Sequence, residues 1–177
     1  MKIANREVGS HTTPLVIAEI GINHDGCLTT AKKMVDEIAK FGGEIVKHQT
    51  HICDDEMTDE AKSIIPPNDS RSIWEIMNDC CLSLDEEVAL KEHCEEIGLI
   101  YISTPFSRAA ADFLDEIGVP AFKIGSGECT NYPLVKHIAS KGKPIIMSTG
   151  LQEIPALKKS VETLRDSGQS FALLECT

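Results

Sequence analysis

The sequence predicts an α/β fold of the (β/α)8 TIM-barrel type that stops after its sixth strand. Six short apolar runs alternate with stretches of helical periodicity, which is the pattern of a parallel sheet. The runs are apolar throughout, as expected for strands that are buried on both faces. Each run ends in polar side chains, and the C-terminal strand ends of such a barrel form the active-site face. An open sheet of six strands is the alternative to a barrel that is cut short.

Length and composition narrow the class of protein. The 177 residues suffice for one domain with a sizeable core. A net charge of −11 argues against nucleic acid and anionic membranes as partners. The seven cysteines include no Cys-x-x-Cys pair, which favours reduced thiols. No apolar run approaches the roughly 20 residues of a membrane span, and the N-terminus lacks a signal-peptide layout, so we expect a cytoplasmic protein.

The first half of the chain is predicted to begin with a short β-hairpin within residues 1–13. The first strand covers Leu15–Ile20, and a helix starts near Thr29 and ends at Gly42-Gly43. The second strand is Glu44–Val46. Residues 50–71 are expected to be irregular, and a segment of that length is usually functional or mobile.

The second half repeats the strand–helix unit. A short helix is predicted near Ser72–Met77, and Ser83 with Glu86 forms a capping box for the next helix, which Gly98 ends. The later strands are predicted at Leu99–Ser103, Ala121–Ile124, Pro144–Met147 and Phe171–Leu174. The helices between them are predicted at Ser107–Ile117, Pro133–Ser140 and Ile154–Ser167.

Two lysines, Lys47 and Lys123, lie within predicted buried strands. A buried lysine is costly unless it is paired or faces a wet cavity. The structural alternative is an ion pair with a neighbouring acid. The functional readings are an anion site for phosphate or carboxylate, or a Schiff base.

Glycines and hydroxyls follow the fourth and fifth strands. Gly125-Ser126-Gly127 would let backbone N–H groups approach an anion, and Glu128 comes next. A dinucleotide fingerprint is excluded because Thr130 stands where glycine or alanine is needed. A plain tight turn is the alternative here. Ser148-Thr149 repeats the pattern, with helix capping as its alternative.

Glu19 closes the first strand and is a candidate general acid or base, or an acceptor for sugar hydroxyls. A salt bridge to a lysine is the alternative. His24 and His48 are candidate metal ligands, but their spacing matches no ligand motif.

Five segments together resemble a known family. They are Ile17–His24, Val46–Thr50, Ser103–Arg108, Phe122–Glu128 and Met147–Gly150. In this order they are similar to bacterial N-acetylneuraminate (sialic acid) synthases over essentially the whole chain. The resemblance implies a TIM barrel followed by a small antifreeze-like domain. Residues 1–177 would then be the N-terminal part of the barrel, without strands seven and eight and without that domain.

The resemblance also implies the chemistry. Such enzymes condense phosphoenolpyruvate with an N-acetylated amino sugar such as N-acetylmannosamine and release phosphate, and a homodimer is expected for the full-length protein. Lys47, Lys123, Ser126 and Ser148 would hold phosphoenolpyruvate. Glu19, Gln49, Asn68, Thr104 and Phe106 would contact the sugar, with Glu19 and Glu128 as the catalytic carboxylates.

A divalent metal, Mn²⁺ or Mg²⁺, is implied as well, with its ligands expected beyond Thr177. Glu175 departs from the histidine or glutamine that the family often has there. The chain alone is therefore expected to be inactive in synthesis. Two other functions remain open: a pyruvate aldolase with a Schiff base on Lys123 or Lys47, and a non-catalytic barrel fragment that binds anions or a partner.

Overall fold

The computed structural model describes residues 1–176, and the chain divides into two compact units. Unit 1 comprises Met1–Leu15 and Ile102–Thr177, and unit 2 comprises Val16–Tyr101. The sheet holds six parallel strands in chain order, β3-β4-β5-β6-β7-β8. The predicted α/β fold class, a TIM-barrel type with six strands, is confirmed.

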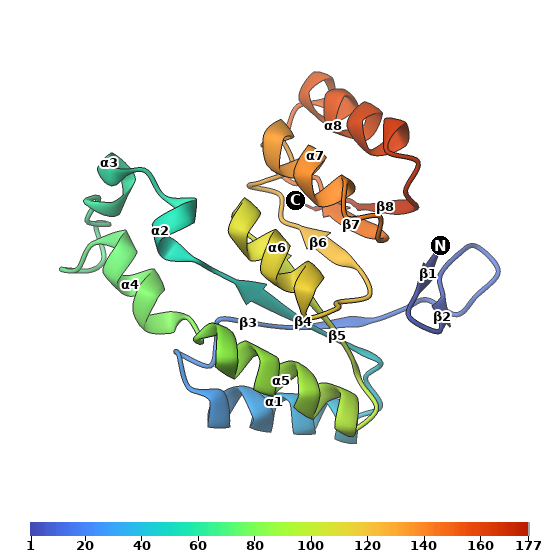
Figure 1. The fold of residues 1–177 in the computed structure, drawn as a ribbon, viewed down its shortest axis with the longest axis horizontal. Coiled ribbons are helices and arrows are strands. Elements are labelled where there is room, and N and C mark those ends of the chain that lie inside the picture. Colours follow the sequence, from blue (N-terminus) through green and yellow to red (C-terminus); the bar gives the residue numbers. More distant parts are fainter. Residues whose placement is uncertain (177) are drawn as a thin grey trace. The chain divides into compact units, whose positions relative to one another are not determined.

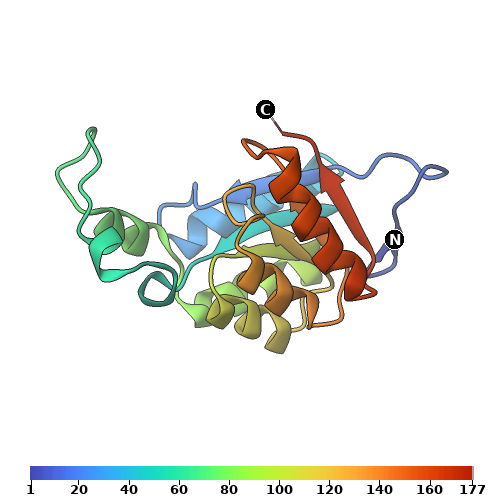
Figure 2. The same cartoon turned by 90° about the horizontal axis from the view of Figure 1, so that it is seen from above.

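Unit 2 contains the first strands and their helices. Strand β3 (Ile17–Gly21) pairs in parallel with β4 (Ile45–Thr50), and β5 (Ile100–Pro105) starts at the end of this unit. Helices α1 (Leu28–Lys40) and α5 (Leu84–Glu96) lie side by side, as both views in Figures 1 and 2 show. Their facing side chains are fully buried and include Ala31, Val35, Leu90 and Cys94.

Unit 1 continues the alternation. Strands β6 (Phe122–Ile124), β7 (Ile145–Ser148) and β8 (Phe171–Leu174) pair in parallel. Helix α6 (Arg108–Glu116) packs on α7 (Tyr132–Ala139), and α7 packs on α8 (Ile154–Asp166) (Figure 1). The core between these helices and the sheet consists of fully buried aliphatic and aromatic side chains, among them Leu114, Phe122, Ile138, Ile145, Met147 and Leu164.

The N-terminal hairpin is confirmed. Strands β1 (Lys2–Ile3) and β2 (Arg6–Glu7) pair antiparallel, with Lys2 opposite Glu7. Ala4 in the turn between them has φ +50°, a left-handed conformation that this tight turn requires. The side chain of Ile3 is fully buried, so the hairpin contributes to the core.

The prediction that residues 50–71 are irregular is partly wrong, because this segment contains two short helices. These are α2 (Cys53–Glu56) and α3 (Asp59–Lys62), each a single turn. Thr58 caps α3, and Lys62 returns to bond Asp54 at 2.9 Å, so local polar contacts stabilise turns that lack an apolar period. The loop from α3 to α4 (Ile73–Cys80) is irregular as predicted, and it extends from unit 2 in Figure 2.

The predicted capping box at the start of α5 (Leu84–Glu96) is confirmed, and α4 begins with another. Ser83 and Ser72 both form complete capping boxes, with Glu86 and Glu75 respectively. Strands β4 and β5 are longer than predicted, because polar residues at their C-terminal ends continue the ladder that apolar residues begin. None of the helices in residues 1–176 is long and apolar enough to cross a bilayer.

Candidate active site

In unit 1, the strand ends of β6 and β7 form a cluster around Lys123, here called the Lys123 cluster (Lys123, Ser126 and Ser148). Lys123 is 6% exposed and donates to Ser148 Oγ at 2.6 Å and to the Ile124 carbonyl at 2.8 Å. The two residues lie on adjacent strands, since Lys123 pairs with Ile146 in the ladder. Ser148 does not cap α8, whose N-cap is Glu153. The capping alternative for Ser148 is therefore excluded.

The turn after β6 lies beside this lysine. Gly125 and Gly127 flank Ser126, and the half-exposed turn is closed by the Glu128 amide on the Gly125 carbonyl at 3.1 Å. Gln152 donates to the Ser126 carbonyl, which fixes the turn to the loop after β7. A Cβ on Gly125 would stand 3.8 Å from Thr104 Cγ2, so the end of β5 reaches the same turn. The predicted residues Thr104, Lys123, Ser126 and Ser148 are thus neighbours in unit 1.

Glu128 is fixed by its own loop. Its carboxylate accepts a hydrogen bond from Asn131 Nδ2 at 2.8 Å, and the Asn131 side-chain oxygen in turn caps α7. Phe106 is half-buried just after β5. The contact of either residue with a substrate stays a prediction.

Cys176, which the sequence reasoning did not single out, lies next to the Lys123 cluster. The Ser148 hydroxyl and the Thr149 and Gly150 amides hold the pKa of its exposed thiol below the ordinary value, and Lys123 adds to that effect. A Cβ on Gly150 would stand 2.8 Å from Cys176 Cβ, so Gly150 permits this close approach. Donors that stabilise a thiolate also suit other anions. Cys176 follows the last predicted strand, and that position was the signal available in the sequence.

In unit 2, β3 and β4 form a second group, here called the Glu19 cluster (Glu19, Lys47 and Gln49). Lys47 Nζ lies 2.8 Å from Glu19 Oε2, and the two residues are ladder partners. The side chain of Lys47 is 10% exposed and that of Glu19 is 43% exposed, so solvent reaches this ion pair at the glutamate. Gln49 Oε1 accepts from His51 at 3.2 Å. The salt-bridge alternative for Glu19 and Lys47 is what the structure shows, and it leaves substrate contact by this cluster a prediction.

Asn68 lies apart from these groups in sequence and in contacts. It is exposed in the loop between α3 and α4. Within residues 1–176 no hydrogen bond joins it to the Glu19 cluster. Its role toward the sugar rests on the resemblance alone.

The described residues do not supply a metal centre. Within residues 1–176 no three or more His, Cys, Asp or Glu side chains gather closely enough to hold an ion. The two histidines considered as ligands, His24 and His48, face each other with their Nε2 atoms at 2.9 Å and bond to each other instead. No catalytic step is therefore assigned to a metal held by these residues.

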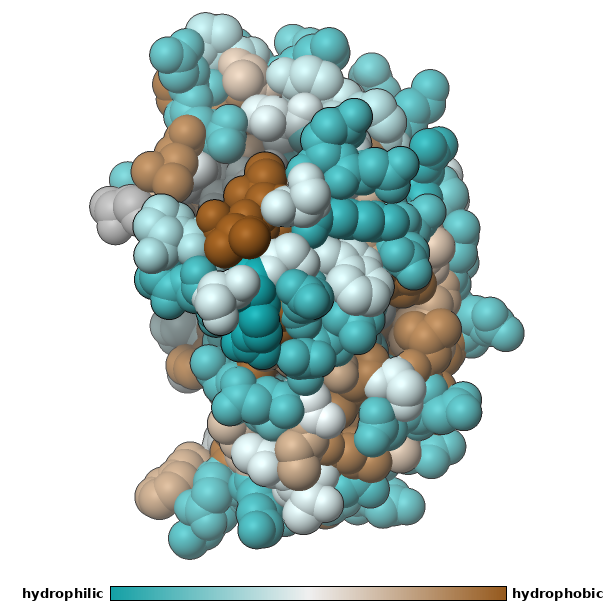
Figure 3. All heavy atoms as spheres, turned by 90° about the vertical axis from the view of Figure 1, so that its left-hand side faces the viewer, coloured by the Kyte–Doolittle hydropathy of each residue, from teal (hydrophilic) through white to brown (hydrophobic). Residues whose placement is uncertain are grey.

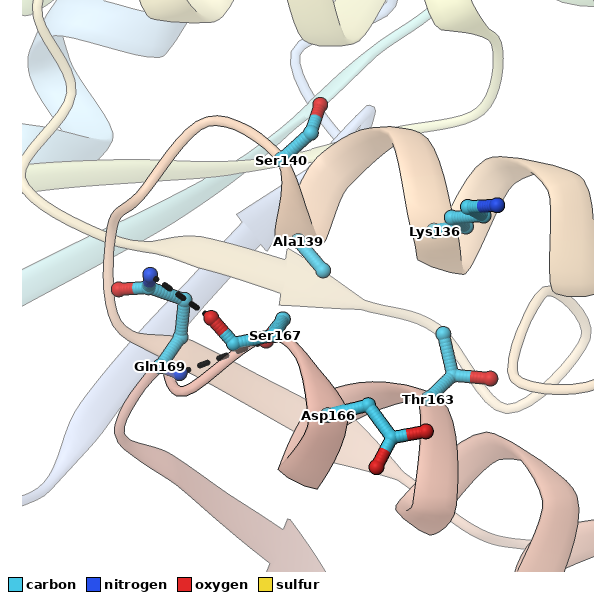
Figure 4. Close-up of a pocket in the computed structure, with 7 residues that line it drawn as sticks. All are labelled: Lys136, Ala139, Ser140, Thr163, Asp166, Ser167 and Gln169. Atoms are coloured by element: carbon cyan, nitrogen blue, oxygen red, sulfur yellow. Dashed lines mark hydrogen bonds between the residues drawn. The ribbon is translucent and has the colours of Figure 1, made fainter.

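A surface pocket lies at the other end of the strands in unit 1. It has a volume of about 520 Å³ and is lined by the last turns of α7 and α8 and the residues that follow, including Lys136, Ser140, Thr163 and Gln169 (Figure 4). These elements precede β7 and β8, so the pocket lies at the N-terminal strand ends. None of the predicted site residues lines it, and it plays no part in the proposal below.

Comparison with known proteins decides the family. The sequence profile described as "NeuB family" matches residues 34–177. This chain belongs to the NeuB family. N-acetylneuraminate-9-phosphate synthase of Drosophila melanogaster is 34% identical over 177 residues, which cover 91% of this chain and 44% of that protein. N,N'-diacetyllegionaminic acid synthase of Campylobacter jejuni is 34% identical over 171 residues, covering 92% and 51%.

Solved structures of NeuB-family proteins agree. The N-acetylneuraminic acid synthetase of Leptospira borgpetersenii, solved with citrate, superimposes with a TM-score of 0.87 at 26% identity, covering all of this chain and 59% of that one. The chain spans about half the length of the curated relatives that it matches. The family and the fold are thus shown, and the resemblance to sialic acid synthases that the sequence motifs indicate is confirmed.

Proposed function

We propose that this NeuB-family chain carries part of the active site of a nonulosonic acid synthase. The reaction joins phosphoenolpyruvate to the aldehyde carbon of an N-acetylated amino sugar and releases phosphate. The names of the relatives support the product class, since they include sialic and legionaminic acid synthases. The chain would be the N-terminal part of the barrel in such an enzyme.

The observation that carries the proposal is the Lys123–Ser148 pair. A buried ammonium bonded at 2.6 Å to a hydroxyl provides one positive charge and a polarised donor at the ends of two adjacent strands. The lowered pKa of Cys176, caused first by the Ser148 hydroxyl, supports an anion site at the same place. Phosphoenolpyruvate offers a phosphate and a carboxylate, and charge-assisted hydrogen bonds suit both.

The chain's own residues supply binding and proton transfer in this scheme. C3 of phosphoenolpyruvate attacks the aldehyde carbon, and the new C–C bond leaves the former aldehyde oxygen in need of a proton. Glu128 and Glu19 are the candidate proton donors. The attack leaves C2 electron-poor, so water adds there and gives up one proton to a carboxylate or to solvent. The C2–O bond to phosphate then breaks, phosphate leaves with the electron pair, and the C2 hydroxyl loses its proton to give the ketone. No covalent enzyme intermediate is formed, in contrast to an aldolase.

Several finer points belong to the same proposal. They are the divalent metal, the homodimer, the cytoplasmic location, and the placement of Lys47, Gln49, Asn68, Thr104 and Phe106 on substrate. The metal would have to be held by residues other than those described, since residues 1–176 contain no suitable group.

The test is phosphate release from phosphoenolpyruvate by the protein that carries this chain, with N-acetylmannosamine and manganese. We expect release only when the sugar is present. Borohydride added with pyruvate or phosphoenolpyruvate should leave no adduct on Lys123 or Lys47. A trapped lysine adduct would instead establish the aldolase, and the absence of both results would leave an anion-binding module.

A further inference from the structure

A connected group of buried polar side chains lies behind the Glu19 cluster in unit 2. Its members come from the loop after β3, from β4, from α5 and from β5, and each is at most 1% exposed. They are His24, His48, Thr50, Glu87 and Tyr101. We call this group the His24–Glu87 network. The proposed function assigns it no role, although so many buried polar groups are costly without a complete set of hydrogen bonds.

The donor and the acceptor of each hydrogen bond in the network can be assigned, starting from Glu87. Tyr101 donates its single hydroxyl proton to Glu87 Oε2 at 3.3 Å, and Thr50 donates to the same oxygen at 2.8 Å. The Tyr101 oxygen therefore accepts from His48 Nδ1, which lies 3.1 Å away. When the proton of the His48 ring is on Nδ1, its Nε2 is the acceptor, so we assign His24 Nε2–H as the donor in the 2.9 Å contact between the rings.

His24 is held neutral, which suits this assignment. Burial lowers the pKa of His24, and the neighbouring His48 lowers it further. Its Nδ1 makes no hydrogen bond within the described residues, and the nearby Gly21 carbonyl offsets part of the lowering of the pKa. The two rings are also stacked, with centroids 5.1 Å apart. One hydrogen bond and one ring contact therefore hold the loop after β3 against β4.

The same loop shapes the Glu19 cluster. The ladder between β3 and β4 shifts register between Glu19 and Gly21, so that Gly21 pairs with His48. Gly21 has φ +52°, and a Cβ there would stand 3.1 Å from Glu19 Oε1 and 3.3 Å from Gln49 Nε2. The register shift places the side chains of Glu19 and Gln49 next to Gly21. Three residues after Gly21, the hydrogen bond between His24 and His48 joins the same loop to β4.

We propose that His24 and His48 are positioning residues for the Glu19 cluster, and that Tyr101 and Glu87 fix the histidine tautomers that this role requires. The inference deepens the proposed function and rests on it for its kinetic consequence. Loss of the ring-to-ring hydrogen bond leaves residues 21–24 held by local bonds such as that from Asn23 to the Ile20 carbonyl, and this looser loop no longer fixes Glu19 as firmly beside Lys47. A displacement of about 1 Å in a reacting or orienting group can cost about 10²-fold in rate.

The structural part is tested by ¹⁵N NMR of the histidine side chains in the protein that carries this chain. We expect the proton on Nε2 in His24 and on Nδ1 in His48. Tyr101→Phe keeps the packing and removes one acceptor of His48 Nδ1, while Glu87 Oε2 still lies 3.6 Å from that nitrogen, so the preference for the Nδ1 tautomer should weaken rather than vanish. Opposite tautomers in the wild type would overturn the assignment.

The kinetic part uses a matched pair of variants. His24→Gln keeps an N–H donor near the position of Nε2, whereas His24→Leu removes it and keeps the volume. We expect His24→Leu to lower kcat about 10- to 100-fold, with the KM for phosphoenolpyruvate within about threefold. His24→Gln should recover most of the rate. His93→Gln, a histidine on the surface of α5 that bonds Asp36, serves as the control and should leave both constants unchanged.

The outcomes separate the two claims. Equal loss in the Gln and Leu variants, or a raised KM at normal kcat, would overturn positioning even if synthesis is confirmed. A wild-type protein without synthase activity would overturn the proposed function, while the tautomer measurements would still decide whether the network is built as described. If His24→Leu does not fold, Tyr101→Phe carries the same kinetic expectation.

Discussion

Lys123 is the residue on which the anion site depends most. Its ammonium group is held in a buried strand by a hydroxyl and a carbonyl, so a bound anion would meet it away from bulk water. We expect Lys123→Ala to weaken phosphoenolpyruvate binding by about 2–4 kcal/mol, the scale for removing one partner of a desolvated charge contact. Calorimetry measures this directly. Lys158→Ala, on the exposed face of α8, is the control, and equal affinity in both variants would remove Lys123 from the site.

Glu128 is expected to act in turnover rather than in binding. Its carboxylate is oriented by Asn131 and lies in the turn that follows Lys123. Glu128→Gln should keep phosphoenolpyruvate affinity and lower kcat by about 10²–10⁴, the usual contribution of a general acid or base. Parallel loss of affinity and rate, or no loss of rate, would assign the residue to the loop structure alone.

His24 should give unit 2 a pH-dependent stability in a narrow window. The groups around it are the Gly21 carbonyl and Asp25 in its own loop, His48 on β4, and Glu86 and Glu87 on α5. Because the folded state lowers the pKa of His24, the unfolded chain binds more protons just below pH 6.5. Stability is therefore complete above pH 6.5 and falls as the pH drops from there toward the folded pKa.

Denaturant unfolding at pH 7.5 and pH 5 measures this loss. The carboxylates whose pKa is lowered by folding include Asp54, Asp69 and Asp112. In the unfolded chain they titrate below about pH 4.5, so they contribute little to a stability difference between pH 7.5 and pH 5. His24→Gln should show a smaller difference between the two pH values. The same difference in both proteins would place the dependence on another group.

Among elements, α5 connects the local sequence to the buried network. Ser83 and Glu86 start the helix with a capping box, and Glu87 in its first turn is the acid that ends the hydrogen-bond chain. Ser83→Ala should lower the free energy of unfolding by about 1 kcal/mol, as cap removal commonly does. Ser83→Thr keeps a hydroxyl acceptor and should cost less. Chemical denaturation compares the two, and equal costs would show that the cap contributes little.

Much of the element order was predictable because strong local signals mark it. Apolar runs, capping serines such as Ser83 and helix-ending glycines such as Gly98 act within a few residues. The helices α2 and α3 were not predictable, because side-chain contacts such as Lys62 with Asp54 stabilise them rather than an apolar period. The ends of β4 and β5 were predicted too early, because the predicted strands were drawn to the end of each apolar run and polar residues continue both strands.

The site was predictable in part for the same reason. Lysines in apolar runs, Lys47 and Lys123, stand out in the sequence, and the structure places each beside a predicted partner, Glu19 and Ser148. The His24–Glu87 network was not predictable, because its hydrogen bonds join residues up to 53 positions apart and Glu87 resembles an ordinary first-turn acid. Its members were visible only as two histidines without a ligand motif.

At the scale of the whole molecule, the chain carries a net charge of −11. Figure 3 shows one face on which hydrophilic residues predominate and hydrophobic ones form small groups. All seven cysteines, which lie within the described residues, are free thiols. Such a surface favours solubility, so association should depend on particular exposed apolar side chains.

The 177-residue chain is expected to associate through β8, the last strand in the sheet order. Leu173 and Leu174 on this strand are 45% and 40% exposed, and apolar strand edges recruit other chains. Leu174→Lys should shift sedimentation toward the monomer. Leu151→Lys changes an even more exposed leucine in the loop after β7 and should have little effect. A wild-type chain that sediments as a monomer at all concentrations would contradict this expectation.

The alternation of side chains along β4 has a consequence for how this protein can change during evolution. Lys47 and Gln49 serve the Glu19 cluster, while His48 and Thr50 between and after them serve the buried network. Substitutions at consecutive positions are therefore expected to damage different parts of the structure. An insertion or deletion of one residue would exchange the two sets of side chains and damage both at once. We expect this stretch to drift little among descendants, although half of its residues never meet a substrate.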